Sequence, residues 1–406
     1  MFDVNEIRKD FPMIVNRPDL VYFDNAATTY KPQRVIDAVT GFYTGYTSNV
    51  ERGDYETAVR ADRAYDHTRE VIAKMIGCDP LEVCFTANVT ASLNQIAYGL
   101  SRCWLKEGDV ILTTKAEHAS NLLPWFRLEK ECGVKVEYVP VDRQGVCHIE
   151  DFRNAMHKEV KVVAMAMVTN VLGSLQPVKE ICEIAHANGA LAVIDGAQAV
   201  PHRPVNVREL DIDFLGFSSH KMCGPDGVGV LYGKKKLLAD MAPSFLGGGM
   251  NARYSSDGSV ILKDAPLRFE AGTPNIEGVI GLGAAAEYLM EIGLDNILAY
   301  ETELRTYTAE KLKKLDNIEF YNPDNHSGPL TFNGKGVFAQ DAAGYLGSRK
   351  ICVRSGNHCA KILHEVIGTD QTIRASLYFY NTKEEADRFI EAAAGISLEN
   401  AVSIFF

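Results

Sequence analysis

The chain has 406 residues, of which 46% are hydrophobic, and its 42 basic and 53 acidic residues give a net charge of −11. Its length favours two domains, and its hydrophobic content is typical of an ordinary globular protein. The acidic balance argues against general nucleic-acid binding, which needs clustered Lys and Arg, and against docking to an anionic membrane.

The first residues and the cysteines indicate a cytoplasmic protein with reduced thiols. The segment MFDVNEIRKDFPMI is charged and interrupted by Pro12, which does not fit a signal peptide. The longest apolar run, 162–168, is far below the roughly 18 residues of a membrane span. The number of cysteines is nine, which is odd, and none form a CxxC pair. We therefore expect neither a disulfide framework nor a metal site.

Short apolar runs alternate with helical patterns through the first two thirds of the chain. Strands are predicted at 83–87, 109–114, 134–141, 161–168, 190–196, 214–219 and 228–233, and helices near 91–102, 121–133 and 178–188. Apolar runs of four to eight residues that alternate with helices predict a mostly parallel sheet covered on both faces.

The pattern changes near Ile276. Two long helices are predicted over 278–293 and 296–315, then strands at 318–321, 336–340, 350–354 and 372–380, and a last helix at 383–394. This order predicts a smaller α+β domain. We place the large domain at 15–283 and the small domain at 1–14 and 284–406, with the helical segment EIRKDF packed on the small domain.

The segment FLGFSSHKMCGPDGVGVLYG (214–233) places Lys221 just after a predicted strand, where α/β proteins bind ligands. Most lysines in such loops are simply solvated. Here Ser218 and His220 could hold a phosphate while the Lys221 amine condenses with an aldehyde. Pyridoxal 5′-phosphate (PLP) needs that combination of groups.

The segment ALAVIDGAQAV (190–200) ends an apolar run on Asp195. A carboxylate there either caps a helix or pairs with a buried cation. PLP needs an acidic partner for its ring nitrogen, because a protonated ring withdraws electrons. Asp195 lies 26 residues before Lys221, with one strand and a helix expected between them, so both can reach one sheet edge.

Six separated segments resemble the class V aminotransferases, and more narrowly the cysteine desulfurases of the SufS/CsdA type (group II). They are YFDNAATT (22–29), DGAQ (195–198), SSHK (218–221), RFEAGTPN (268–275), SGNHCA (355–360) and RASLYFYNT (374–382). The resemblance implies the PLP-dependent transferase fold of type I, with a mostly parallel seven-stranded sheet between helices and a smaller α+β domain.

The resemblance also assigns roles to matching residues. Lys221 resembles the PLP lysine, and Asp195, Gln198 and His118 resemble the groups that contact the ring nitrogen, the ring oxygen and the ring face. The phosphate ligands implied are Thr90, Ser218 and His220, together with Thr273 from a second subunit. The role of Thr273 implies a homodimer.

The substrate side of the site is implied in the same way. Asn170 and Arg374 resemble the residues that hold the carboxylate of L-cysteine, and Cys359 resembles the nucleophile that receives its sulfur as a persulfide while alanine leaves. Arg354, His358 and Lys361 are candidates for the positive charge that would favour the thiolate.

The resemblance implies that the enzyme supplies sulfur for iron–sulfur clusters through a SufE- or SufU-like acceptor. The alternatives are a selenocysteine lyase or cysteine sulfinate desulfinase on the same scaffold, a class V aminotransferase or epimerase that does not use Cys359, and a binding protein with a degenerate site. Asn357, Lys361 and Ala119 depart from the usual pattern, which leaves recognition of the acceptor open.

Overall fold

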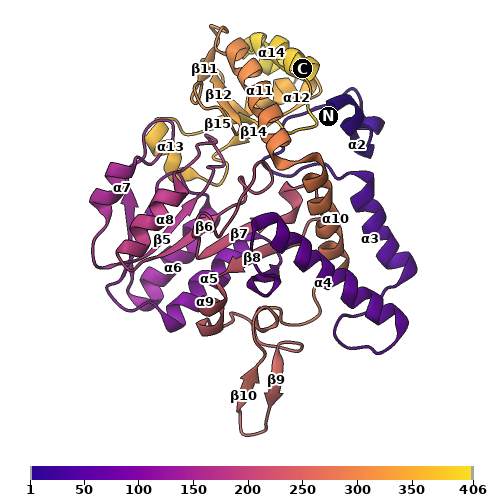
Figure 1. Cartoon of the computed structure of the whole chain (residues 1–406). Helices are drawn as coiled ribbons and strands as arrows, with labels where there is room; N and C mark the ends of the chain where they lie inside the picture. Colours follow the sequence, from indigo (N-terminus) through magenta and orange to yellow (C-terminus); the bar gives the residue numbers. More distant parts are fainter. Residues whose placement is uncertain (1, 404–406) are drawn as a thin grey trace.

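The computed structural model of the protein describes residues 2–403 and has two lobes (Figure 1). The larger is built on a seven-stranded sheet with the order β2-β8-β7-β6-β5-β3-β4. The strands are β2 (Val83–Thr86), β3 (Val110–Thr114), β4 (Lys135–Val139), β5 (Val160–Ala166), β6 (Leu191–Asp195), β7 (Phe214–Ser218) and β8 (Gly229–Gly233). Neighbours from β4 to β7 pair in parallel, and β8 is antiparallel to both β7 and β2. The predicted mostly parallel sheet is confirmed.

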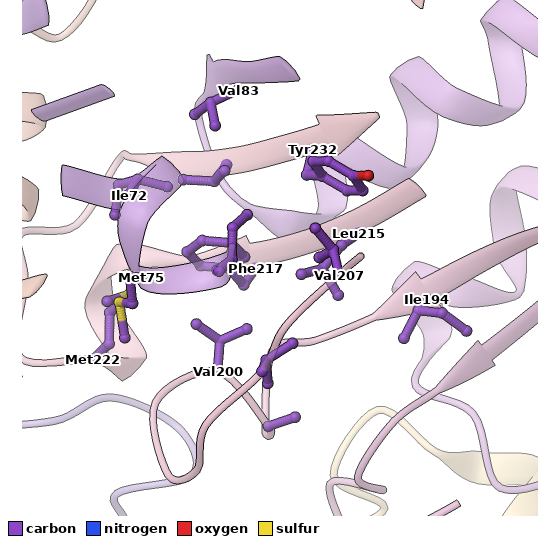
Figure 2. Packing of buried hydrophobic residues seen from close by; sticks show 14 of the residues in the cluster. Ile72, Met75, Val83, Ile194, Val200, Val207, Leu215, Phe217, Met222 and Tyr232 are labelled. Carbon is purple, nitrogen blue, oxygen red and sulfur yellow. The ribbon is translucent and has the colours of Figure 1, made fainter. Parts of the chain in front are cut away.

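Both faces of this sheet are covered. Successive residues of β5 point to opposite sides, so Val163 and Met165 join one hydrophobic cluster while Val162 and Ala164 join another. The helices of this lobe are α3 (Gln33–Gly45), α4 (Glu56–Ile76), α5 (Val89–Cys103), α6 (Leu123–Cys132), α7 (Ile149–Ala155), α8 (Val178–Ala187), α9 (Lys235–Asp240) and α10 (Ile276–Ile292). Helix α4 packs on the first cluster, and Figure 2 shows its Ile72 and Met75 among the side chains of that cluster, together with Leu215 and Phe217 of β7. Helices α5 and α6 cover the second.

The smaller lobe lies beside the carboxyl ends of the parallel strands and carries the last third of the chain (Figure 1). Its antiparallel sheet has the order β11-β12-β15-β14. The strands are β11 (Ile318–Phe320), β12 (Leu330–Gly334), β14 (Arg354–Gly356) and β15 (Thr372–Ala375), and the helices are α11 (Leu294–Leu312), α12 (Ala339–Ser348), α13 (Lys361–Ile367), α14 (Lys383–Ala394) and α15 (Leu398–Ser403). The predicted α+β composition is confirmed.

Several short elements complete the chain. Strand β1 (Val21–Tyr22) pairs in parallel with β13 (Ile351–Cys352), and β9 (Asn251–Tyr254) forms a hairpin with β10 (Val260–Leu262). The first helices are α1 (Val4–Arg8) and α2 (Pro12–Asn16), and four 3₁₀ helices are η1 (Pro80–Glu82), η2 (Ala119–Asn121), η3 (Ser219–Lys221) and η4 (Leu267–Phe269). The β9–β10 hairpin projects from the large lobe on the side away from the small lobe (Figure 1).

Three details of the sequence prediction are wrong. The predicted strand 336–340 is a turn that leads into α12, because Gly336 has a φ of 72° and the apolar residues after it recur with helical spacing. The predicted strand 372–380 ends at Ala375, and Asn381 accepts a hydrogen bond from the Tyr378 backbone in the turn that follows. No α-helix lies between Asp195 and Lys221, because residues 196–213 form turns, bends and irregular segments before β7 begins.

The division into domains stays a prediction. Gly283 lies inside α10, whose buried residues as far as Leu289 pack in the cluster of the large sheet. Val21 and Phe23, assigned to the large domain, pack in the cluster of the small sheet. We propose that the change from one lobe to the other lies nearer to Gly293, between α10 and α11.

Candidate active site

The predicted site residues meet in one cavity of about 260 Å³ between the two lobes. Its floor is formed where β5, β6 and β7 end, at Ala166, Asp195 and Ser218, which is the edge where α/β sheets bind ligands. The predicted residues that line it are Thr90, His118, Asn170, Asp195, Gln198, Ser218, His220, Lys221, Cys359 and Arg374. Thr273 does not line this cavity. It is exposed after η4, where Asn49 Nδ2 lies 3.4 Å from its hydroxyl.

Lys221 ends the 3₁₀ helix that directly follows β7. The Thr28 hydroxyl and the Thr29 backbone N–H both donate to the His220 carbonyl, which fixes this turn against the first segment of the chain. Burial of the amine lowers the pKa of Lys221 to about 8, although the Asp195 carboxylate opposes the shift. A lysine with that pKa holds a substantial neutral fraction near neutral pH, which a nucleophilic amine requires.

Asp195 is the last residue of β6 and is only 5% exposed. Its Oδ1 accepts a hydrogen bond of 2.9 Å from the Ala197 backbone, so it does cap the following turn. No α-helix directly follows Asp195, so the helix-cap alternative is wrong. The same carboxylate lines the cavity, and its pairing with a cation there stays a prediction. The pKa of Asp195 is raised because the carboxyl is buried, although the Ala197 N–H and the Lys221 charge oppose this shift. Gln198 donates to the Ala26 carbonyl at 2.9 Å on the same wall.

One end of the cavity is suited to an anion. Thr90 is the second residue of α5, whose N-terminal backbone groups carry a partial positive charge, and Asn88 caps that helix. The Ser218 hydroxyl accepts from the Val89 N–H at 2.8 Å, and the hydroxyls of Thr90 and Ser120 lie 2.6 Å apart. Several hydroxyl groups and a helix N-terminus thus converge where the resemblance places a phosphate.

His118 precedes η2, and its Nδ1 accepts a hydrogen bond of 3.1 Å from the Ser120 backbone. Burial lowers the pKa of His118 to about 4, and the charge of Lys221 adds to the effect. Burial likewise lowers the pKa of His220 to about 4. Both imidazoles are therefore neutral near pH 7 in this cavity, so neither contributes a positive charge to it.

Arg374 and Asn170 approach the cavity from the two lobes and contact each other. Arg374 is 2% exposed, donates to the Asn170 carbonyl at 3.0 Å and lies 3.4 Å from an Asp24 oxygen. Burial lowers the pKa of Arg374 to about 10, and Asp24 opposes that shift. Within residues 2–403, Arg374 Nε and Asn170 Oδ1 have no hydrogen-bond partner although both are buried. Unsatisfied buried donors and acceptors at a cavity wall are suited to a polar ligand.

Cys359 lies on the small-lobe wall, in the loop between β14 and α13. Its side chain is exposed, and both His358 and Cys359 have positive φ values, of 50° and 57°. The backbone holds the loop in place, since the Cys359 carbonyl accepts from the Ala119 N–H at 2.7 Å and the His358 carbonyl accepts from Asn170 Nδ2 at 2.8 Å. These two hydrogen bonds therefore hold the loop against the turn after His118 and against Asn170, while the Cys359 thiol stays accessible.

Known proteins resemble this chain along nearly its whole length. The family Aminotransferase class-V matches residues 21–389. A probable cysteine desulfurase of Halalkalibacterium halodurans is 43% identical, with 95% of this chain and 96% of that protein covered. A cysteine desulfurase of Haloferax volcanii is 39% identical, with 96% of each covered. The chain belongs to the cysteine desulfurases of the class-V aminotransferase family. Members of this family use PLP.

Solved structures of desulfurases have the same fold. The apo cysteine desulfurase of Thermococcus onnurineus NA1 matches with a TM-score of 0.91 and 39% identity over 95% of this chain and 96% of that one. The cysteine desulfurase CsdA of Escherichia coli, in an S-sulfonic acid form, also gives a TM-score of 0.91, with 34% identity over 100% of this chain and 99% of that one. The predicted type I fold is thereby confirmed.

Sequence reasoning did not assign a role to three residues that shape this desulfurase cavity. Asp24 lies against Arg374, although its segment was noted only as part of a motif. Ser120 contacts both Thr90 and His118. Glu117 is buried and accepts from Thr114, Asn121 and the Ala166 backbone at 2.7–2.8 Å, which ties the His118 turn to the end of β5. The contacts of Asp24 with Arg374, of Ser120 with Thr90 and of Glu117 with Ala166 join segments far apart in the sequence, which only the fold brings together.

Among the residues that the structure describes, no group of three or more His, Cys, Asp or Glu side chains could hold a metal ion. None of the helices in the described range is long and apolar enough to cross a membrane.

Proposed function

We propose that this desulfurase converts L-cysteine to L-alanine with PLP held at Lys221, and passes the substrate sulfur to Cys359 as a persulfide. The observation that carries the proposal is the placement of Lys221 and Cys359 on the large-lobe and small-lobe walls of one cavity, with Asp195 and Arg374 beside them. A site that only formed and broke bonds at Cα would have no need of a thiol facing the same space.

The residues present fit PLP. Lys221 supplies an amine with a lowered pKa, Asp195 a buried carboxylate, and Thr90, Ser218 and the α5 N-terminus supply phosphate ligands. Gln198 and His118 would contact the ring. When bound, PLP withdraws electrons from the substrate's Cα and so makes its bonds labile.

The chain's own residues can then be given roles. Arg374 would bind the substrate carboxylate through the Nε that lacks a partner within residues 2–403, and Asn170 would donate to it the second N–H of Nδ2, whose first N–H bonds the His358 carbonyl. The Lys221 amine would take the proton from Cα and later return a proton there. Cβ, which keeps the electron pair of the broken C–S bond, takes a second proton as alanine forms. The Cys359 sulfur would form an S–S bond with the substrate sulfur while the Cβ–S bond breaks.

The positive charge near Cys359 comes from arginine rather than histidine. Burial and Arg374 lower the pKa of His358 to about 2, so this imidazole stays neutral and does not favour a thiolate. Lys361 is exposed on the first turn of α13. Arg354 lines the same cavity as Cys359 and is the candidate that we retain.

We further propose a homodimer in which Thr273 completes the phosphate site of the second subunit, which agrees with its position outside the cavity of its own chain. We also propose a cytoplasmic enzyme that delivers its persulfide sulfur to a SufE- or SufU-like protein for iron–sulfur cluster assembly. The exposure of Cys359 supports transfer to a protein acceptor.

The test of the nucleophile is Cys359→Ala in the PLP-loaded enzyme. We expect the substitution to abolish persulfide and sulfide formation from L-cysteine while the visible absorbance of bound PLP remains. Cys103→Ala is the matched control, because Cys103 is also exposed but lies at the end of α5. Desulfuration that survives in Cys359→Ala would show that another group receives the sulfur.

Substrate preference distinguishes the alternative enzyme. Alanine formation is compared for L-cysteine, L-selenocysteine and L-cysteine sulfinate with the same enzyme. A cysteine desulfurase depends on Cys359 for L-cysteine. Fast turnover of selenocysteine or the sulfinate, with none of L-cysteine, would instead identify a selenocysteine lyase or a cysteine sulfinate desulfinase.

A further inference from the structure

A second cavity lies between the lobes, behind the wall formed by Ala26, Val168 and Gln198, which it shares with the active-site cavity. Its other walls come from α11, from the turns that follow β6, and from the segments at Thr169, 327–329 and 376–377. The volume of this cavity is about 30 Å³, which is more than one water molecule needs. The charged side chains that line this second cavity have no role in the proposed desulfurase mechanism.

Charged side chains from both lobes line this second cavity. Glu301 and Arg305 lie one turn apart on the same face of α11, and His202 and Arg203 come from the large lobe. His202 Nδ1 lies 2.8 Å from Glu301 Oε2, which leaves the other oxygen of that carboxylate. Two arginines and one carboxylate line the cavity, and Asp324, whose charge also acts on Arg305, is exposed and pairs with Lys313. At least one positive charge in the lining is therefore unbalanced. An anion would balance it.

The hydrogen bonds that these groups lack define the ligand more closely. Arg305 is 2% exposed and donates through Nη2 to the Asn322 carbonyl at 2.6 Å, but its Nε has no partner within residues 2–403. In that range no donor meets hydrogen-bond geometry at the buried Glu301 Oε1, although the Phe379 backbone N–H lies near this carboxyl and opposes the rise in its pKa that burial causes. The Arg203 side chain makes no hydrogen bond or ion pair to any described residue, and burial lowers its pKa. The ligand must therefore accept from guanidinium groups and donate to a carboxylate.

We propose that this cavity binds a small planar monoanion that keeps one proton, of the bicarbonate class. Two of its oxygens accept from Arg203 and from Arg305 Nε, because a planar oxyanion matches the guanidinium fork. Its hydroxyl donates to Glu301 Oε1. A halide or formate accepts from the arginines but has no hydrogen to donate, so it leaves the Glu301 oxygen unsatisfied.

The test is calorimetric titration of the PLP-loaded enzyme with bicarbonate, formate or chloride at constant pH and ionic strength. We expect saturable binding of one bicarbonate per chain, at least tenfold tighter than formate or chloride. Arg203→Gln should abolish it, whereas Arg153→Gln, which removes the same charge from an exposed position on α7, should leave it unchanged.

Glu301→Gln tests the hydroxyl contact. The amide can still accept from His202 and now offers an N–H to the cavity, so formate should bind at least as tightly as bicarbonate. Circular dichroism and thermal unfolding check that each variant is folded. The proposal is overturned if bicarbonate gives no saturable heat with the unmodified enzyme, which means that water fills the cavity, if Arg203→Gln binds bicarbonate normally, or if formate and bicarbonate bind alike before Glu301 is changed.

Discussion

The two walls of the active-site cavity are built in different ways. On the large-lobe wall, Asp195 ends β6 and Lys221 follows β7, and every residue of these two strands is buried. On the small-lobe wall, Cys359 lies in an exposed loop, and two successive non-glycine residues there have positive φ values. Left-handed backbone costs such residues about 1–2 kcal/mol each.

The contrast follows from what each wall must do. The groups that would hold PLP need a fixed geometry, which a fully buried parallel sheet provides. The thiol must meet a substrate inside the cavity and an acceptor outside it. Its loop is therefore held through backbone oxygens, at Ala119 N–H and Asn170 Nδ2, while its side chain is left free. The comparison predicts that substitutions on the two walls will fail in different ways.

The largest effect is expected at the large-lobe wall. Lys221→Ala removes both the amine that binds PLP and the group that moves the Cα proton, so alanine formation should fall by a factor on the order of 10²–10⁴. PLP should be lost on gel filtration. Lys115→Ala, an exposed lysine between β3 and η2, is the control. If Lys221→Ala keeps its visible absorbance and its turnover, the assignment of the PLP lysine is wrong.

A smaller effect concerns the pH at which the apoenzyme captures PLP. Only the neutral amine attacks an aldehyde, and burial lowers the pKa of Lys221 to about 8. The neutral fraction, and with it the capture rate, should rise roughly tenfold from pH 7 to pH 9 and then level off. Stopped-flow absorbance measures this rate. A lysine of ordinary pKa would give a rise of roughly 100-fold with no plateau, which would contradict the effect of burial.

The large-lobe wall was also the part that sequence could predict. The apolar runs before Asp195 and Lys221 specify buried parallel strands, and the ends of such strands meet at one edge. The small-lobe wall was less predictable. The strand predicted over 336–340 is wrong, because a short apolar run that leads into a helix does not show whether its apolar residues recur with the spacing of a strand or of a helix. The contacts of Cys359 with Ala119 and of His358 with Asn170 join segments more than 180 residues apart, and no local pattern encodes them.

The charged residues of the second cavity were also not predictable from local sequence. Glu301 and Arg305 on α11 have the spacing of an ordinary surface ion pair. In the fold they face the large lobe instead, and Glu301 pairs with His202. Sequence spacing gives the shared face of a helix but does not show what covers that face.

The smallest effect is expected from Asn357, which lies two residues before Cys359 in the same loop. Its Nδ2 donates to the Asp370 carbonyl at 2.7 Å and so closes the Cys359 loop against the turn before β15. Asn357→Ala removes one neutral hydrogen bond, worth about 1 kcal/mol, so the loop should open severalfold more often. We expect faster alkylation of Cys359 by iodoacetamide and a severalfold slower persulfide formation, because the thiol then spends less time facing the substrate.

The control for this change is Asn188→Ala. Asn188 also donates one side-chain hydrogen bond to a backbone carbonyl, that of Ile184 at 2.8 Å, but at the end of α8. Both variants lose a similar bond, and only Asn357→Ala should alter the reactivity of Cys359. An unchanged alkylation rate in Asn357→Ala would mean that the Ala119 and Asn170 contacts alone hold the loop. The difference between the two walls would then rest on those two contacts to backbone carbonyls and not on Asn357.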